Sequence, residues 1–441
     1  MTDTLDALFP AHLCTIRQRM DKALAACGFD AVVIHAGAPI TLFLDDHDYP
    51  FKPSPHFKAW VPLTEHPHCA VVYRPGSRPK LLFNRPDDYW HKPPDLPTAD
   101  WTREYELVPI ALPGDANAHW KSLERAALIG PPPAFAGADP SAVNPTQLLT
   151  RLHYDRAVKT PYELACMRLA SELGARGHQA ALSCFRAGGS EYEAHMRYLE
   201  ACRQREEEMP YNNIVAFNEN GAVLHYQHLA RQAPAQRRSF LLDAGAQYRG
   251  YASDITRTHA AGPGAFADLV AAMDAAQLRM CDEIRSGTDF RDVHLSAHRM
   301  IGDVLQAAGL IKLGGQAAVE AGLTSVFFPH GIGHLLGLQV HDVGGVMGDS
   351  AGHERPRPAG HPYLRMTRML EPGVVVTVEP GVYWIDSLLK TAAADARREL
   401  IDWQCVDAFR PYGGIRIEDN VVATAGTPEN LTRNAFVRIA A

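Results

Sequence analysis

The sequence of 441 residues predicts two domains, an α/β domain over residues 1–159 and an α+β domain over residues 160–441. Length is the first observation, because a chain of this size exceeds what one hydrophobic core normally serves. The second is the run Thr160-Pro161-Tyr162-Glu163, which combines an N-cap, a first-turn proline and a capping-box glutamate at the boundary. The third is a change of pattern, since short mixed elements precede this run and long paired helices follow it.

The elements expected in the first domain are of modest length. Residues 10–27 suit an amphipathic helix, and the apolar run at residues 29–36 suits a buried strand. Residues 68–73 and 80–83 flank the turn sequence Arg-Pro-Gly-Ser-Arg-Pro, so they are expected to form a hairpin. A further strand is expected at residues 125–130, immediately before three prolines. Alternation of this kind is typical of a small α/β domain.

Four long helices are expected in the second domain, in two pairs separated by apolar strands. A capping box at Ser190-x-x-Glu193 marks the start of one helix, and Gly309 marks the end of another. The expected helices cover residues 160–185, 190–204, 266–284 and 290–308. The expected strand-rich stretches cover residues 239–244, 251–259, 374–384 and 414–422. Residues 344–362, rich in Gly, Pro and Arg, are expected to be irregular.

Charge and composition exclude several classes of protein. The formal net charge of −7 provides no basic field for nucleic acid or for an anionic membrane surface. No apolar run approaches the roughly 20 residues of a membrane span, and the acidic N-terminus does not have the pattern of a signal peptide. The eight cysteines include no Cys-x-x-Cys pair, which indicates buried thiols in a reducing compartment. We therefore expect a cytoplasmic protein with no nucleic-acid or membrane partner.

Residues 327–342 hold the densest group of potential metal ligands. His330, His334 and His341 lie within twelve residues that also include three glycines. The spacing of His330 and His334 would suit one face of a helix, but Gly331 and Gly333 argue against a helix interior. A single histidine is more often a structural residue than a ligand, so a metal site also requires acidic partners elsewhere in the chain.

Acidic residues of the required kind occur in the strand-rich stretches, each within an apolar frame. Asp243 ends a buried strand, and Asp254 follows eleven residues later across an expected turn, so a hairpin would bring the two carboxylates together. Glu379 lies in Val-Val-Thr-Val-Glu-Pro-Gly, and Glu418 lies in Ile-Arg-Ile-Glu-Asp. Unpaired carboxylates in such surroundings cost several kcal/mol each, so these four acids require cations.

Charge balance predicts the number and kind of ions. Four carboxylates would be neutralised by two divalent ions, and His334 would supply a neutral fifth ligand. The alternative is pairing with Arg257, Arg365 and Arg416, which would explain only one or two of the acids. Oxygen ligands with one nitrogen and no thiolate suit Mn²⁺, Co²⁺ or Fe²⁺ better than a structural zinc site. Two ions roughly 3.5–4 Å apart would activate a shared water and polarise a carbonyl.

These residues carry a family resemblance. Asp243, Asp254, His334, Glu379 and Glu418, within the motifs quoted above, resemble the five ligands of the pita-bread metallopeptidases, which include methionine aminopeptidase, aminopeptidase P and prolidase. The wider chain is similar to the bacterial Xaa-Pro dipeptidases of the PepQ type, a group that also covers organophosphorus acid anhydrolase. The segments that carry this wider similarity are residues 44–47, 210–215, 223–226 and 337–344. The resemblance implies a creatinase-like α/β N-terminal domain followed by a pita-bread catalytic domain.

The resemblance also implies the arrangement of the metal ligands. Asp254 and Glu418 would bridge two metal ions, with Mn²⁺ the expected cofactor. Asp243 would complete one metal site, and His334 with Glu379 would complete the other. Glu379 would in addition act as the general acid/base, which carries the proton of the attacking water to the leaving proline nitrogen.

Further residues are assigned to the substrate carbonyl by the same resemblance. His225 and His341 would lie beside the carbonyl or its tetrahedral oxyanion, where a positioned donor is typically worth about 2.7–4 kcal/mol. His330 would line the same pocket or form a hydrogen bond to one of its residues. These three histidines complete the expected catalytic surface.

The two ends of a dipeptide require their own partners. Arg416 and Arg365 are the candidates for the proline carboxylate, because a guanidinium binds a carboxylate with two parallel hydrogen bonds. Arg416 shares a strand face with Glu418, so it is alternatively a brace for a metal-binding carboxylate. Tyr211 would line the pocket or act as a core aromatic. Asp45 would hold the substrate amine from a partner subunit, which would make the catalytic unit a homodimer.

The expected activity is hydrolysis of Xaa-Pro dipeptides by a metal-bridged hydroxide. An Xaa-Pro bond is a tertiary amide without an N–H, so it escapes peptidases that recognise this group. The close alternative is aminopeptidase P cleavage of longer Xaa-Pro peptides, and hydrolysis of organophosphorus esters is an alternative main or side activity. A metal-free binding module and creatinase-like chemistry are disfavoured, because all five ligand residues are present.

Overall fold

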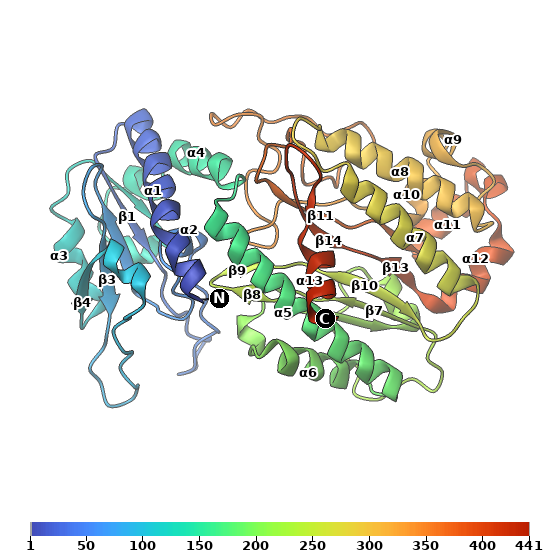
Figure 1. Cartoon of the computed structure of the whole chain (residues 1–441), viewed down its shortest axis with the longest axis horizontal. Coiled ribbons are helices and arrows are strands. Elements are labelled where there is room, and N and C mark those ends of the chain that lie inside the picture. The colour runs from blue at the N-terminus through green and yellow to red at the C-terminus, as the bar shows by residue number, and fades with distance from the viewer. Residues whose placement is uncertain (1, 441) are drawn as a thin grey trace. The chain divides into compact units, whose positions relative to one another are not determined.

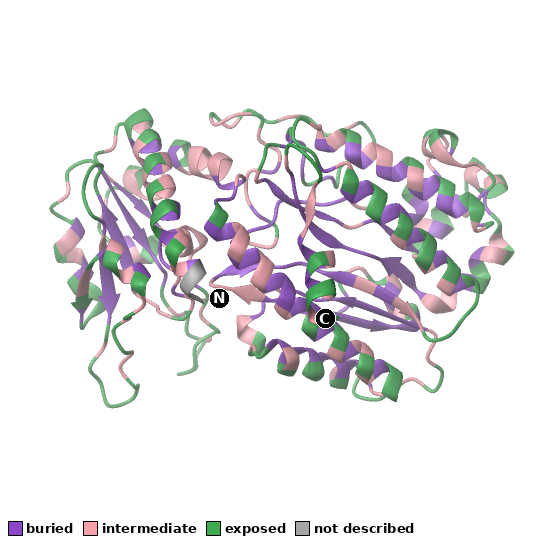
Figure 2. Ribbon diagram, viewed as in Figure 1, coloured by how far each residue is buried: buried purple, intermediate pink, exposed green. Residues whose placement is uncertain are grey.

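The computed structural model describes residues 2–440, which fall into two compact units (Figure 1). Unit 1 consists of Met1–Cys166, Arg249–Tyr251 and Asp349–His353, and unit 2 consists of Met167–Tyr248, Ala252–Gly348 and Glu354–Ala441. Each unit combines helices with a buried set of strands, and the helices expose their outer faces (Figure 2). None of the helices described between residues 2 and 440 is long and apolar enough to cross a membrane.

Unit 1 is built on a five-stranded sheet in the order β4-β3-β2-β1-β5. The expected hairpin forms, because β2 pairs antiparallel with β3. Strand β1 pairs parallel with β5. The strands are β1 (Ala31–His35), β2 (Ala70–Tyr73), β3 (Lys80–Asn84), β4 (Glu106–Ile110) and β5 (Ala126–Ile129). The helices are α1 (Thr2–Cys27), α2 (Pro55–Trp60), α3 (Asn117–Trp120) and α4 (Thr146–Arg156). The mixed α/β character predicted for this part of the chain is confirmed.

The start of the first helix differs from the prediction. Helix α1 begins at Thr2 and continues through Pro10, whereas we expected it to begin at residue 10. Leu5 and Phe9, which precede the proline, are 3% and 1% exposed. Burial of these two side chains is worth several kcal/mol, which offsets the roughly 3 kcal/mol cost of a proline in a helix interior.

The strands of unit 2 lie between two pairs of helices, α5 with α6 and α7 with α8 (Figure 1). Two three-stranded sheets have the orders β10-β7-β6 and β11-β14-β15, and β12 pairs with β13. The strands are β6 (Ile214–Phe217), β7 (Ser239–Asp243), β8 (Gln247–Tyr248), β9 (Tyr251–Ala252), β10 (Thr256–Ala260), β11 (Val375–Val378), β12 (Gly381–Tyr383), β13 (Gly414–Arg416), β14 (Asp419–Val422) and β15 (Glu429–Asn430). Strand β7 and helix α5 share a core through Phe240, Leu242 and Phe185.

The long helices of unit 2 begin where the capping signals predict. The Thr160 N–H donates to Glu163 Oε2 (2.8 Å) at the start of α5, and the Ser190 N–H donates to Glu193 Oε2 (2.8 Å) at the start of α6. The helices are α5 (Pro161–Ala187), α6 (Glu191–Cys202), α7 (Ala265–Asp282), α8 (Phe290–Ala307), α9 (Gly315–Glu320), α10 (Thr324–Phe327), α11 (Asp386–Ala393), α12 (Trp403–Phe409) and α13 (Leu431–Ala440). Short 3-10 turns connect several of these elements.

Candidate metal centre

Three of the expected strand-rich stretches are interrupted at an acidic residue. Asp254 lies between β9 and β10, Glu379 lies between β11 and β12, and Glu418 lies between β13 and β14. Strands therefore form in each of these expected strand-rich stretches, and each stretch is divided into two strands at its acidic residue. Side chains in an unbroken strand alternate between two faces, whereas a break lets the chain turn a carboxylate toward other elements. Asp243 differs, because it is the last residue of β7 and pairs with Thr256 in the sheet.

The segment around His334 runs beside β11 in an extended conformation, not as a helix. The Thr377 N–H donates to the His334 carbonyl (2.9 Å), and the Glu379 N–H donates to the Ile332 carbonyl (2.8 Å). A Cβ on Gly333 would stand 1.9 Å from the Thr377 carbonyl oxygen, so only glycine permits this approach. Gly333 of the His-Gly-Ile-Gly-His motif thus serves a close backbone contact with the strand that leads to Glu379, which places His334 beside that residue.

The structure brings the five predicted ligands together. His334 Nε2 lies 3.5 Å from Asp254 Oδ2 and 3.5 Å from Glu379 Oε1. One ligand atom from each of Asp254, His334 and Glu418 lies within 4.8 Å of the other two. Asp243 and Glu379 line the same cavity as these three residues. Their roles as metal ligands stay a prediction, but their convergence is a property of the fold.

The charges of this group favour bound cations. The Tyr211 hydroxyl lies 2.8 Å from Asp243 Oδ1 and 2.5 Å from Asp254 Oδ1, although its single proton can serve only one of them. Burial raises the pKa of Asp243, raises that of Glu379 to about 7, and raises that of Glu418 well above its ordinary value. Arg416 pairs with Asp243, and without metal the other buried acids would depend on protons for compensation. Four carboxylates and one imidazole therefore fit a divalent-metal centre.

A network of hydrogen bonds among buried side chains holds one of the carboxylates, Asp243, in place. Arg416 is 4% exposed, donates from Nη2 to Asp243 Oδ2 (2.7 Å) and donates from Nη1 to the Tyr383 hydroxyl (3.0 Å). The same hydroxyl lies 2.9 Å from His330 Nε2, whose Nδ1 lies 2.9 Å from the Gly331 carbonyl. Sequence reasoning missed Tyr383, because an aromatic residue in an apolar strand indicates only a core position.

The cavity above this network has a volume of about 750 Å³. His225, His330, His341 and Tyr211 all line it, as expected. Burial lowers the pKa of His330 to about 3, and desolvation followed by the nearby His334 lowers that of His341 to about 4. Both histidines are therefore neutral at physiological pH. The single N–H of His330 donates to the Gly331 carbonyl, so of these two histidines His341 is the one that can donate an N–H to a substrate oxygen.

Two arginines also line the cavity, Arg357 in the irregular segment and Arg365 just after it. Arg365 is exposed and makes no hydrogen bond or ion pair with any other residue that the structure describes. Arg357 is exposed and donates from Nε to the Leu364 carbonyl (2.6 Å). Sequence reasoning named Arg365 but missed Arg357, because nothing in the sequence distinguishes it from Arg355 in the same Gly- and Pro-rich segment.

Asp45 lies in unit 1, in the loop between β1 and α2. Its Oδ1 accepts from the Asp46 N–H (2.7 Å) and lies 3.2 Å from His47 Nδ1. The Asp45 side chain is half exposed, and Phe43 and Leu44 beside it are 90% and 91% exposed. With Ile40 and Tyr49, the described residues of this loop therefore present four large hydrophobic side chains to solvent, which is unusual for a connection between two elements.

Comparison with known proteins identifies the family. Residues 165–425 match the model of metallopeptidase family M24, and residues 7–154 match the model of the Xaa-Pro dipeptidase N-terminal domain. The chain belongs to metallopeptidase family M24. This metallopeptidase is 51% identical to the Xaa-Pro dipeptidase of Xanthomonas campestris pv. campestris and 49% identical to that of Xanthomonas euvesicatoria pv. vesicatoria, over 98% of each chain. It is also 49% identical to the Xaa-Pro dipeptidase of Stenotrophomonas maltophilia, over 98% of this chain and 97% of the relative.

Solved structures similar to the metallopeptidase are aminopeptidases P. Proline aminopeptidase P II from Yersinia pestis matches with a TM-score of 0.69 and 25% identity, over 98% of this chain and 96% of that protein. Zn-substituted Escherichia coli aminopeptidase P in complex with product matches with a TM-score of 0.68 and 24% identity, over 95% of both chains. These matches confirm the predicted fold class, an α/β N-terminal domain with a pita-bread catalytic domain. Family and ligand set together indicate that the centre binds divalent metal.

Proposed function

We propose that this metallopeptidase is an Xaa-Pro dipeptidase that works with two divalent ions, natively Mn²⁺. The observation that carries the proposal is the convergence of four carboxylates and His334 on a cavity that also holds the unpaired guanidinium of Arg365. Relatives that are about half identical over almost the whole chain carry the same activity in their names. A volume of about 750 Å³ is ample for a dipeptide.

The ligand roles follow the expected pattern. Asp254 and Glu418 are the proposed bridging ligands, Asp243 completes one site, and His334 with Glu379 completes the other. Bound divalent ions would supply a water that is activated at neutral pH, and they would polarise the scissile carbonyl. The preference for Mn²⁺ rests on the donor atoms, which are mostly carboxylate oxygens and include no thiolate.

The remaining chemistry belongs to the side chains of the cavity. Glu379 has a pKa raised by burial to about 7, so it can both accept and return a proton near neutral pH. We assign it the transfer of a proton to the proline nitrogen, which cannot leave without one. His225 and His341 are proposed as donors to the carbonyl oxygen, and His330 is proposed to orient the substrate beside Tyr383.

The structure favours different roles for the two candidate arginines. Arg416 already donates to Asp243 and Tyr383, so we propose that it positions a metal ligand. Arg365 has no such partner among residues 2–440 and lines the cavity, so we propose that it binds the proline carboxylate. Arg357 is a second guanidinium available at the same cavity. Tyr211, bound to two of the acids, is proposed to line the substrate site from the metal side.

We also propose that the enzyme is a homodimer, as the resemblance implies. Contact with a second copy would bury the exposed side chains of Phe43 and Leu44. The adjacent Asp45 would then hold the substrate amine of the partner's active site. A cytoplasmic location is proposed as well, in keeping with eight cysteines that are all free.

The first test compares Mn²⁺-dependent hydrolysis of Ala-Pro, Ala-Pro-Ala and a phosphotriester, with Asp254→Asn as the control. Rapid cleavage of the dipeptide alone, lost in the control, is the expected result. Equal or faster cleavage of the tripeptide would replace the proposal with aminopeptidase P activity, which the similarity to solved aminopeptidases P makes the nearest rival. Faster turnover of the phosphotriester than of either peptide would make ester hydrolysis the main activity.

A further inference from the structure

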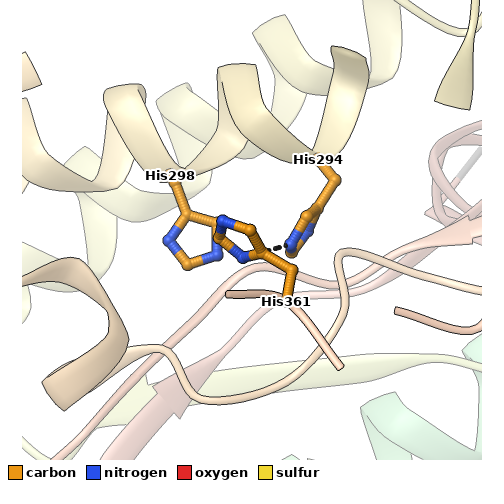
Figure 3. Close-up of side chains that lie close together, drawn as sticks. All are labelled: His294, His298 and His361. Carbon is orange, nitrogen blue, oxygen red and sulfur yellow. Dashed lines mark hydrogen bonds between the residues drawn. The ribbon is translucent and has the colours of Figure 1, made fainter. Parts of the chain in front are cut away.

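A second group of potential metal ligands lies outside the residues that line the cavity. His294 and His298 are neighbouring side chains on α8, and His361 approaches them from the irregular segment (Figure 3). The ring centroids are 4.7 Å apart for His294 and His298, and 4.6 Å apart for each of the other two pairs. One nitrogen of each ring lies within 4.8 Å of the others. Three imidazoles on one tetrahedral ion, at metal–nitrogen distances of about 2.0–2.1 Å, would need centroids about 5 Å apart.

His298 supplies a nitrogen that the fold leaves unused. The residue is 1% exposed, and its Nδ1 lies 2.9 Å from Thr324 Oγ1. Its Nε2 is buried and has no hydrogen-bond partner among the described residues. A ring that donates from Nδ1 to Thr324 keeps a free lone pair on Nε2. This is the usual state of a metal-binding histidine, whose other nitrogen donates to an outer partner.

The protonation of the cluster also suits a metal ion. Burial lowers the pKa of His294 to about 2 and that of His298 to about 3, and it lowers the pKa of His361 as well. All three rings are therefore neutral at physiological pH, as ligation requires. Nitrogen donors without any carboxylate favour Zn²⁺ over Mn²⁺, so this cluster differs in metal preference from the oxygen-rich centre.

We propose that His294, His298 and His361 form a separate Zn²⁺ site that ties the irregular segment to α8. His361 is only partly buried, so a water can complete four-coordination from the solvent side. The proposal concerns different residues from the peptidase centre, and it stands whether or not the peptidase activity is confirmed.

Zinc at this site would alter the backbone near His334. His294 Nε2 lies 2.9 Å from His361 Nδ1, and His294 Nδ1 accepts a hydrogen bond from the Ile332 N–H (3.3 Å). Binding through Nε2 moves the ring proton to Nδ1, which can then no longer accept from Ile332. The Ile332 carbonyl accepts a hydrogen bond from the Glu379 N–H. Zinc binding would therefore change the hydrogen bonding of the segment that carries the proposed catalytic ligands.

The test measures metal content after equilibrium dialysis of the Mn²⁺-loaded protein against low micromolar Zn²⁺. Wild type is compared with His298→Ala and with His361→Ala, which changes a more exposed position and so guards against a folding defect. His353→Ala is the matched control, because His353 is an exposed histidine nearby in sequence that pairs with Asp349 instead. Wild type and control should hold one more zinc per chain than the two cluster variants, with manganese unchanged.

Hydrogen exchange provides the second measurement. Zinc should slow exchange in peptides covering residues 357–364 and speed exchange in those covering residues 330–334, in wild type but not in the cluster variants. Equal zinc in all four proteins would mean adventitious surface binding only and would overturn the proposal. A gain of zinc matched by a loss of manganese would overturn it too, since the zinc would then occupy the peptidase centre. Zinc binding without the faster exchange at residues 330–334 would refute the link to Ile332.

Discussion

Replacement of Arg365 by alanine tests the proposed recognition of the proline carboxylate. Arg365 lines the cavity, is exposed, and forms no hydrogen bond or ion pair within the described part of the chain. The substitution therefore breaks no hydrogen bond or ion pair among the residues that the structure describes. We expect the free energy of unfolding to change by less than about 0.5 kcal/mol, as for most surface substitutions.

The expected loss of activity follows from the kind of bond removed. A hydrogen bond to a charged group contributes about 1.5–3 kcal/mol, and the solvent exposure of Arg365 places it near the lower end of this range. A loss of about 1.5–2 kcal/mol corresponds to a roughly 10- to 30-fold lower kcat/KM. The carboxylate is bound equally in the ground state and the transition state, so the change should lie mainly in KM.

The assay is a double-mutant cycle between the enzyme and its substrate. Wild type and Arg365→Ala are each measured with Ala-Pro and with its C-terminal amide, which lacks the carboxylate. The variant should lose activity with the acid and match wild type with the amide. Arg357→Ala is the control for a general loss of positive charge at the cavity. An equal loss with both peptides in Arg365→Ala would show that this arginine does not bind the carboxylate, and the reasoning would fail.

Three further predictions concern the backbone, the buried charges and the metal. Gly333→Ala should lower the content of bound divalent metal, because its Cβ would meet the Thr377 carbonyl at 1.9 Å, and unchanged metal content would contradict this. Burial lowers the pKa of His178 to about 3, so the unfolded state binds the extra proton and stability falls as the pH drops from about 6.5 toward 3. In urea unfolding, His178→Asn should reduce the slope of the free energy of unfolding against pH by about 1.4 kcal/mol per pH unit. Plots for wild type and variant that run parallel would refute the prediction. The raised pKa of Glu379 stabilises the metal-free fold fully below about pH 4.5, and this stabilisation is lost as the pH rises to about 7. Chelation should therefore destabilise the enzyme more at pH 7 and above than at lower pH, and a pH-independent loss in thermal unfolding would refute this prediction.

Local chemistry made the helix starts and the site predictable. The capping boxes at Thr160 and Ser190 involve residues only three positions apart, and both sets of hydrogen bonds form. The candidate ligands were recognised for a similar reason. A carboxylate that lies within an apolar run is expected to be buried, and a buried carboxylate requires a cation. Their assembly could be expected because each acid occupied a separate stretch of the same predicted domain.

The parts that could not be predicted depend on contacts between distant segments. Tyr383 connects Arg416 to His330 by hydrogen bonds. The residues next to Tyr383 in the sequence give no indication of either contact. The cluster of His294, His298 and His361 was not predicted for the same reason, since its last two members lie 63 positions apart in the sequence. The first helix was predicted too short because burial of side chains before Pro10 is a tertiary effect.

The breaks within the expected strand-rich stretches lie at the candidate site. Asp254, Glu379 and Glu418 interrupt the strands in which their apolar neighbours place them, so local preference and final structure conflict at these residues. Conflict of this kind is expected at functional positions, because a uniform strand would be the more stable solution. The protein buries acids at these positions beside a cavity, an arrangement that favours bound cations over a purely structural role.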